Sequence, residues 1–277
     1  MMNKPFFQKS LHFYQSDAIA VDIHYHVNNK ANIILLPALG VAISKYDQLI
    51  QALTQQNLNV ITADYPGCGR NTPSVSAEFD YGYADLLGYF IPQLVKMSKD
   101  VLDQKPIILG HSLGGHLATL YAQYEDVDVI AIATGNIGFL NWNLKGKLNI
   151  LKAVITFNAM ILKDGYLAGY KIGFGNKEAK TLMQDWCKTV FTGDYKHILE
   201  DETISENSAL FIQFKNDEFA PLSSTLALSR YFKNPQIKIL DLTVTIQGNQ
   251  HSVWIKQPQS VVTLIRKWIV SRENSIF

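Results

Sequence analysis

The chain contains 277 residues, of which 47% are hydrophobic and 18% charged, a composition typical of a globular protein with a sizeable buried core. Its formal net charge is +1, so the overall charge provides no bulk attraction to nucleic acid or to an anionic membrane. Two cysteines, Cys68 and Cys187, are too few for a disulfide framework, and we expect two reduced thiols in a cytoplasmic protein.

The first nine residues contain no apolar core of signal-peptide length. The longest apolar runs, at 33–43 and 148–162, are interrupted by proline, glycine, lysine or asparagine. Neither run has the length and continuity of a membrane-spanning helix. We therefore expect no stable membrane insertion and no nucleic-acid partner, and the sequence carries no signal of oligomeric state.

Strands and helices alternate through the first half of the chain. Alternating apolar residues predict a half-buried strand at 19–27, with His24 and His26 on its exposed polar face. Two such histidines could hold a metal, but exposed strand histidines are the commoner case, so we predict no metal site. The elements that follow are a strand at 32–36, a helix at 44–56 with Ser44 as N-cap, a strand at 58–63, one or two helices at 81–99 broken at Pro92, and strands at 107–109 and 127–133.

The alternation stops at Gly135 and resumes at Ala209. The intervening segment is rich in aromatic residues and favours helix, with no clear strand of the main sheet. After it come a strand at 209–214, a helix at 223–231, a strand at 237–245 and a helix at 260–270. This order predicts an α/β fold with a mostly parallel sheet covered by helices on both faces. We expect a core domain formed by 1–134 and 208–277, and a helical cap inserted at 135–207.

A Gly-x-Ser-x-Gly motif links the strand at 107–109 to a helix that includes 117–122. This order of strand, sharp turn and helix is the context of a serine nucleophile elbow, in which the serine adopts a strained positive φ. Gly110 and Gly114 leave room for the tight turn. The motif therefore predicts Ser112 as a nucleophile.

A serine nucleophile needs a base, and the base needs an orienting carboxylate. Asp217 follows the strand ending at Phe214, and His251 follows the strand expected to end near Ile246. Because the carboxyl ends of parallel strands share one edge of a sheet, we expect both side chains beside Ser112. The candidates that fit less well are Glu218, Asp126, Asp128, His12, His111, His116 and His197.

The reaction also needs donors for an oxyanion. The backbone N–H of Leu113 follows the nucleophile at a helix N-terminus, and the N–H of Leu39 lies in the loop after the strand at 32–36. Ala38, His111 and Trp254 are candidates for substrate contact.

At these motifs the chain resembles the α/β-hydrolase superfamily over nearly its whole length. It is most similar to bacterial predicted hydrolases related to monoglyceride lipases and serine aminopeptidases. The resemblance implies an α/β-hydrolase fold and a Ser-Asp-His triad. In much of the superfamily the first motif reads His-Gly-x-x-Gly, whereas Pro37 and Ala38 stand in the His-Gly places here. Pro66 and Asn71 also replace the usual Arg and Ser, a difference that we attribute to loop packing. The motif residues are 36–40, 64–69, 110–115, Asp217, Pro221, His251 and Trp254.

These features predict a serine hydrolase, of the carboxylesterase or lipase type, that cleaves an ester or related acyl substrate of small to medium size. An apolar substrate follows if the cap aromatics overlie Ser112, although they could equally be the core of the cap. An interfacial lid for lipid substrates at 148–162 is a further hypothesis. No cofactor is expected, because the glycine-rich segment 64–70 lacks the residues of a phosphate-binding loop.

Four alternative functions are compatible with the same sequence features. An acyltransferase or a thioesterase would use the same triad with a different acceptor or acyl bond. An aminopeptidase would need cap carboxylates, which 200–202 could supply. A non-catalytic binding protein that retained the fold is the alternative from another class.

Overall fold

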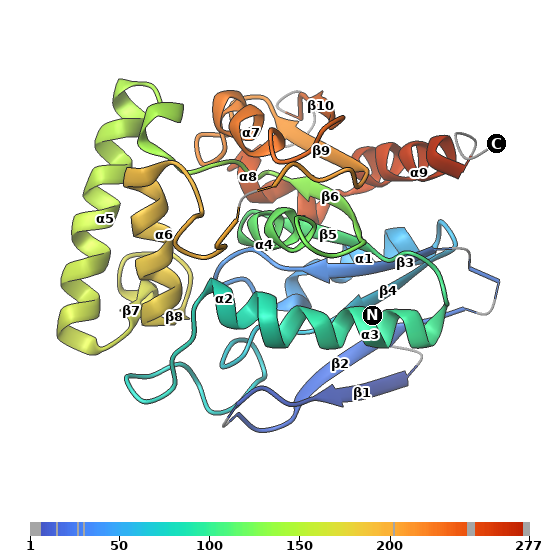
Figure 1. The fold of residues 1–277 in the computed structure, drawn as a ribbon, viewed down its shortest axis with the longest axis horizontal. Helices are drawn as coiled ribbons and strands as arrows, with labels where there is room; N and C mark the ends of the chain where they lie inside the picture. The colour runs from blue at the N-terminus through green and yellow to red at the C-terminus, as the bar shows by residue number, and fades with distance from the viewer. Residues whose placement is uncertain are drawn as a thin grey trace.

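The computed structural model describes residues 7–14, 16–26, 28–29, 31–201, 203–242 and 247–273. An eight-stranded sheet crosses the molecule in the order β1-β2-β4-β3-β5-β6-β9-β10 (Figure 1). The first two pairings in this order are antiparallel and the rest are parallel, which confirms the mostly parallel sheet. The strands are β1 Phe7–Leu11, β2 Ile19–His24, β3 Ala31–Leu36, β4 Leu58–Thr62, β5 Ile107–His111, β6 Asp128–Ile132, β9 Ala209–Phe214 and β10 Gln236–Leu240.

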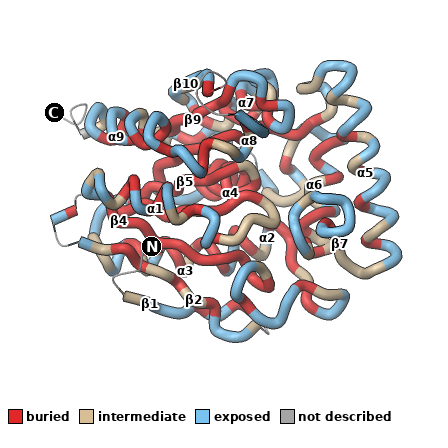
Figure 2. The backbone as a smooth tube through the Cα atoms, turned by 180° about the vertical axis from the view of Figure 1, so that it is seen from behind, coloured by how far each residue is buried: buried red, intermediate tan, exposed pale blue. Residues whose placement is uncertain are grey.

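Helices cover both faces of this sheet. Successive residues of a strand point to opposite faces, so Ile34 packs with Leu117 of α4 while Ile33 packs with Val261 of α9 in a separate cluster. Figure 2 shows the central strands as a buried layer between these helices. The core helices are α1 Asp47–Thr54, α2 Tyr83–Asp85, α3 Ile91–Val101, α4 Leu113–Tyr121, α7 Leu222–Ser229, α8 Gln250–Val253 and α9 Gln259–Glu273, with short 3-10 or π turns at Ile43–Tyr46, Leu86–Phe90 and Trp254–Lys256.

The segment between β6 and β9 forms a helical layer at one side of the molecule (Figure 1). It contains the long helix α5, Leu144–Asp164, and the shorter α6, Lys180–Thr192, which share an apolar cluster of their own. A two-stranded antiparallel sheet, β7 Leu167–Ala168 and β8 Lys177–Glu178, adds strands that the sequence did not predict. None of the described residues of this segment adds a strand to the main sheet, as expected. The division into two domains stays a prediction.

Several local predictions differ from the structure. Ser44 lies inside a 3-10 turn and does not cap α1, because the chain is already turning at Ile43. Pro92 falls in the first turn of α3, directly after the π turn, where its missing N–H is tolerated. The last predicted strand ends at Leu240, and its expected end at 243–246 lies outside the described residues.

His24, expected on an exposed face, is buried at the end of β2, where it lies opposite Val60 of β4 in the interior of the sheet and not at its edge. Among the helices of the described ranges, none is both long and apolar enough to cross a membrane.

Candidate active site

The turn between β5 and α4 holds Ser112 in an unusual backbone conformation. Its φ is 52° and its ψ is −111°, a backbone conformation that residues other than glycine rarely adopt. A Cβ on Gly110 would lie 2.1 Å from the carbonyl of Gly114, and one on Gly114 would lie 2.3 Å from the carbonyl oxygen of Leu36. A side chain at either glycine would therefore collide with the turn itself or with β3, and the backbone of the turn has the geometry that the motif predicts.

The structure brings Ser112, His251 and Asp217 together. The Nε2 atom of His251 lies 3.0 Å from Ser112 Oγ, and Nδ1 lies 2.9 Å from Asp217 Oδ2. Because a carboxylate only accepts hydrogen bonds, the neutral ring carries its proton on Nδ1 and leaves Nε2 to accept from the serine hydroxyl. This tautomer is the one that a general base for Ser112 requires.

Asp217 is held from two directions. Its side chain is fully buried, and its Oδ1 atom also accepts from the backbone N–H groups of Phe219 at 2.8 Å and Ala220 at 3.0 Å. The loop that follows β9 thus wraps around its own carboxylate. His251 lies in α8, where the Asn249 side chain caps the helix by accepting from the His251 N–H. The two loops meet at the carboxyl edge of the sheet, as predicted.

Beneath the triad runs a chain of buried hydrogen bonds. The Ala38 N–H donates to the Tyr46 hydroxyl at 2.8 Å, and that hydroxyl lies 2.8 Å from His111 Nδ1. The Nε2 atom of His111 lies 2.9 Å from the carbonyl oxygen of His251. Since a carbonyl cannot donate, His111 Nε2 carries the proton, and Tyr46 must donate to Nδ1. Burial lowers the pKa of His111 well below its usual range, so the ring is neutral as this assignment requires.

The residues predicted to contact substrate instead belong to this series of buried hydrogen bonds or lie against it. His111 is fully buried within it, and Trp254, also fully buried, donates from Nε1 to the same His251 carbonyl at 3.1 Å. Neither side chain is open to a substrate, so their positions do not support the predicted contacts. Ala38 is nearly buried, and its N–H is already used by Tyr46.

The predicted oxyanion donors lie in two segments next to Ser112. Leu113 is the first residue of α4. Leu39 follows β3 and comes directly after Ala38, whose N–H donates to the Tyr46 hydroxyl. In the described part of the chain, no hydrogen bond uses the N–H of either leucine. The segment before Leu39 is fixed at Pro37 as well, because the Tyr65 hydroxyl donates to its carbonyl at 2.9 Å. A segment without the usual His-Gly pair is thus held by two tyrosine hydroxyls.

The carboxylates that fitted less well as the partner of His251 lie away from the triad or are exposed. Asp128 is buried at the opposite edge of the sheet, where it pairs with Arg272 and with Lys105 at 3.1 Å. Glu218 is 74% exposed and pairs with Lys145 at 2.9 Å. Of the acidic run considered for an aminopeptidase, residues 200 and 201 are exposed, and Glu202 lies outside the described residues.

Two histidines and one loop asparagine have structural partners. The Nδ1 atom of His116 lies 3.1 Å from the Tyr83 hydroxyl, and Nε2 lies 2.8 Å from the Gly135 carbonyl oxygen. His197 Nε2 bonds to the carbonyl of Asp185. Asn71, which replaces the usual serine, donates to two carbonyls of its own loop, in agreement with a role in loop packing.

Three further residues near the site were not singled out from the sequence. Tyr46 lies in the segment predicted as a helix at 44–56, and the available signal was that the hydroxyl of a buried tyrosine needs a hydrogen-bond partner. Glu178 of β8 is 1% exposed, and burial raises its pKa to about 7. Its Oε1 atom accepts from the Asn176 N–H at 2.7 Å. Phe219 is 53% exposed, and its ring centroid lies 5.4 Å from that of His251.

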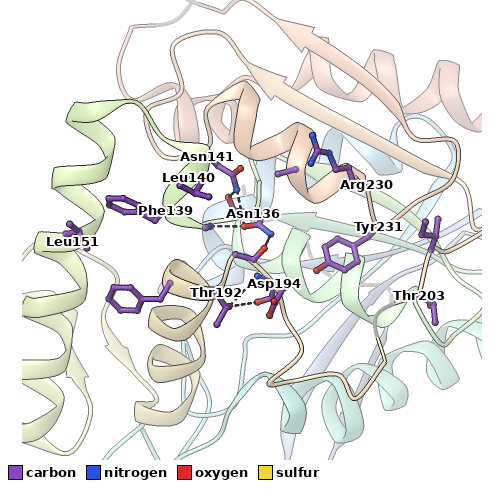
Figure 3. Close-up of a pocket in the computed structure, with 15 residues that line it drawn as sticks. Asn136, Phe139, Leu140, Asn141, Leu151, Thr192, Asp194, Thr203, Arg230 and Tyr231 are labelled. Atoms are coloured by element: carbon purple, nitrogen blue, oxygen red, sulfur yellow. Dashed lines mark hydrogen bonds between the residues drawn. The ribbon is translucent and has the colours of Figure 1, made fainter.

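A pocket of about 780 Å³ lies apart from the triad, between the α5–α6 layer and α7 (Figure 3). No residue of the triad and neither predicted oxyanion donor lines it. One wall is apolar and contains Phe139, Leu140 and Leu151, whereas Arg230 and Tyr231 lie across from it (Figure 3).

The comparisons with known proteins agree with this architecture. The profile of the alpha/beta hydrolase family matches residues 33–263. No curated protein sequence matches the chain significantly.

Three solved structures illustrate the likeness in fold. A carboxylesterase structure from Nitrososphaera gargenis has a TM-score of 0.65 at 16% identity and covers 96% of this chain and 99% of its own. A monoacylglycerol lipase from Paleococcus ferrophilus has a TM-score of 0.61 at 16% identity, with coverages of 91% and 98%. A haloalkane dehalogenase variant from Bradyrhizobium elkanii has a TM-score of 0.69 at 11% identity, with coverages of 97% and 98%. At such identities these structures share the fold with this chain and do not define its substrate. On the family match across most of its length, the chain belongs to the alpha/beta hydrolase family.

Proposed function

We propose that this chain is a serine hydrolase that cleaves a carboxylic ester or a related acyl substrate. The observation that carries the proposal is the hydrogen-bonded order Ser112, His251, Asp217, with Nε2 of the histidine 3.0 Å from the serine oxygen. The fold alone would not support it, since a dehalogenase shares that fold. A dehalogenase of this type would need a carboxylate where Ser112 stands.

The reaction follows from the tautomer of His251. Ser112 Oγ attacks the acyl carbon while its proton passes to His251 Nε2, and buried Asp217 stabilises the imidazolium that forms. The negative oxygen of the tetrahedral intermediate accepts from the N–H groups of Leu39 and Leu113. The intermediate collapses when His251 returns the proton to the leaving alkoxide. Water then attacks the acyl-enzyme by the same steps in the same site, which releases the acid and restores Ser112.

Two side chains near the triad support an apolar substrate. Phe219 presents a largely exposed ring beside His251, and Leu39 packs against the apolar cluster of the α5–α6 layer. Most aromatic residues of the cap give weaker support for an apolar substrate, because they pack against one another. The Phe157 ring, for example, lies 4.9 Å from that of Phe174 and 5.6 Å from that of Trp186, which makes these three side chains part of the core of that layer.

Labelling with a fluorophosphonate probe, followed by hydrolysis of p-nitrophenyl esters of increasing chain length, tests the proposal. We expect one labelled serine, loss of label in Ser112→Ala, and retained label in Ser223→Ala, an exposed serine on α7. Unchanged labelling of a folded Ser112→Ala variant would refute the assignment of the nucleophile. Product analysis with added alcohols or thiols identifies the acyl acceptor, and transfer in preference to hydrolysis would replace the hydrolase with an acyltransferase.

A further inference from the structure

The outer side of α5 carries a row of exposed apolar side chains. Leu144 is 76% exposed, Leu148 54%, Ile155 70% and Leu162 90%. The spacing of these residues puts them along one stripe of the helix, on a different side from the inner stripe that packs on the rest of the layer. That inner stripe is buried at Ile150, Val154, Phe157 and Ile161. A helix with one apolar stripe would need only the inner one to dock, so the outer stripe is not explained by folding.

The apolar surface continues beyond α5. Leu140, which is 85% exposed, and Phe191 of α6, which is 65% exposed, line the pocket of about 780 Å³ together with Leu151. Figure 3 shows Leu140 and Leu151 on the same wall. α5 forms the outermost element of the molecule on this side (Figure 1). Extended exposed apolar surfaces of this kind usually mark an interaction site.

The charges on α5 are positive except at its last residue. The helix contains lysines at 145, 147, 152 and 163, and its single carboxylate, Asp164 at the C-terminal end, pairs with Lys171 at 2.7 Å. Lys145 pairs with Glu218, and Lys147 lies over the Phe139 ring at 5.3 Å. Lys152 and Lys163 form no ion pair with any residue that the structure describes, and helical spacing places both along one edge of the exposed stripe. The net charge of +1 conceals this patch because acidic residues elsewhere balance it.

We propose that the outer face of α5 docks on an anionic lipid surface, with the helix lying in the plane of the interface. The apolar stripe would enter the boundary between headgroups and acyl chains, and the lysines would contact anionic headgroups. A second copy of the chain is a poorer occupant, since two such faces would bring their lysines together.

Co-sedimentation with lipid vesicles tests this docking. Vesicles of phosphatidylcholine alone are compared with vesicles of equal parts phosphatidylcholine and phosphatidylglycerol, at low and at high salt. We expect binding to the anionic vesicles, weakened by salt. The double variant Lys152→Glu, Lys163→Glu should reduce that binding more than about tenfold. Leu148→Gln combined with Ile155→Gln should reduce it as well, because the stripe would no longer enter the interface.

The matched control carries Lys238→Glu and Ile239→Gln on β10, a lysine and an isoleucine that are also exposed but lie far from α5 (Figure 1). It should bind like the unaltered protein. All variants should keep the circular dichroism spectrum and the rate on a short soluble ester, which separates this test from the proposed hydrolase function. Equal binding to both vesicle types, no binding to either, or equal binding by all variants would overturn the proposal. So would a dimer that the Leu148→Gln change dissociates.

Discussion

The buried hydrogen bonds that link Ala38 to His251 and the outer face of α5 differ in whether their side chains have partners within the protein. In the buried chain each donor has one acceptor, and the direction of every bond from Ala38 to His251 follows from the chemistry of the next group. On α5 the exposed leucines and lysines find few partners within the protein. Changes in the first region should therefore alter catalysis or stability, and changes in the second should alter only what the protein binds.

The largest effect should come from Asp217→Asn. The amide cannot serve as a two-oxygen acceptor for His251 Nδ1–H, so the imidazole loses its orientation and the support of its positive charge. We expect the turnover number for a short ester to fall about 10⁴-fold. Glu218→Gln, one residue further and 74% exposed, should change it little. A similar loss in both variants would mean that disruption of the loop, and not the carboxylate of Asp217, explains the effect.

The next effect should come from Tyr46→Phe, which leaves the Ala38 N–H and His111 Nδ1 unpaired. We expect a loss of about 1–3 kcal/mol in the free energy of unfolding. The turnover number should fall by about tenfold or more with KM nearly unchanged, because we expect these hydrogen bonds to hold both His251 and the segment of the proposed donor Leu39 in place relative to Ser112.

Tyr83→Phe is the matched control for this change. Tyr83 is equally buried and also bonds to a histidine, His116, but it lies outside the chain that reaches His251. It should lower stability without lowering the turnover number. If the two variants lose activity in proportion to their loss of stability, the positioning role of Tyr46 is wrong.

A smaller effect, dependent on pH, should come from Glu178→Gln. The folded-state pKa of Glu178 is raised to about 7 from the usual 4.5, so folding favours its protonated form. Its contribution to stability is therefore full below about pH 4.5, declines as the pH rises, and is lost above about pH 7. The variant should match the unaltered protein near pH 4.5 and exceed it by about 2–3 kcal/mol at pH 8, as measured by urea unfolding. A pH-independent difference would contradict this account.

The smallest effect should come from Leu162→Ala on the outer side of α5. Leu162 is 90% exposed, whereas its neighbour Ile161 is 5% exposed. We expect a change in the free energy of unfolding within about 0.5 kcal/mol for Leu162→Ala and a loss of about 2–5 kcal/mol for Ile161→Ala. Equal losses in thermal or urea unfolding would mean that the outer stripe is packed in solution.

The sequence by itself determined most elements of the main sheet and the order of the candidate triad, but not β1 or the small β7–β8 sheet. Strand and helix periods are local, and the glycines around Ser112 act within a few residues of the turn, so the elbow could be predicted without knowledge of the rest. The places of Asp217 and His251 followed from one global rule, that parallel strands end at a shared edge.

Only the tertiary structure decided which side chains meet across large separations in sequence. Tyr46 and His111 are 65 residues apart, and His111 and His251 are 140 apart, and nothing in the local pattern of any of them requires these bonds. The same holds for the outer stripe of α5. Its residues have the spacing of a buried face, and whether such a face is covered depends on how the neighbouring elements pack.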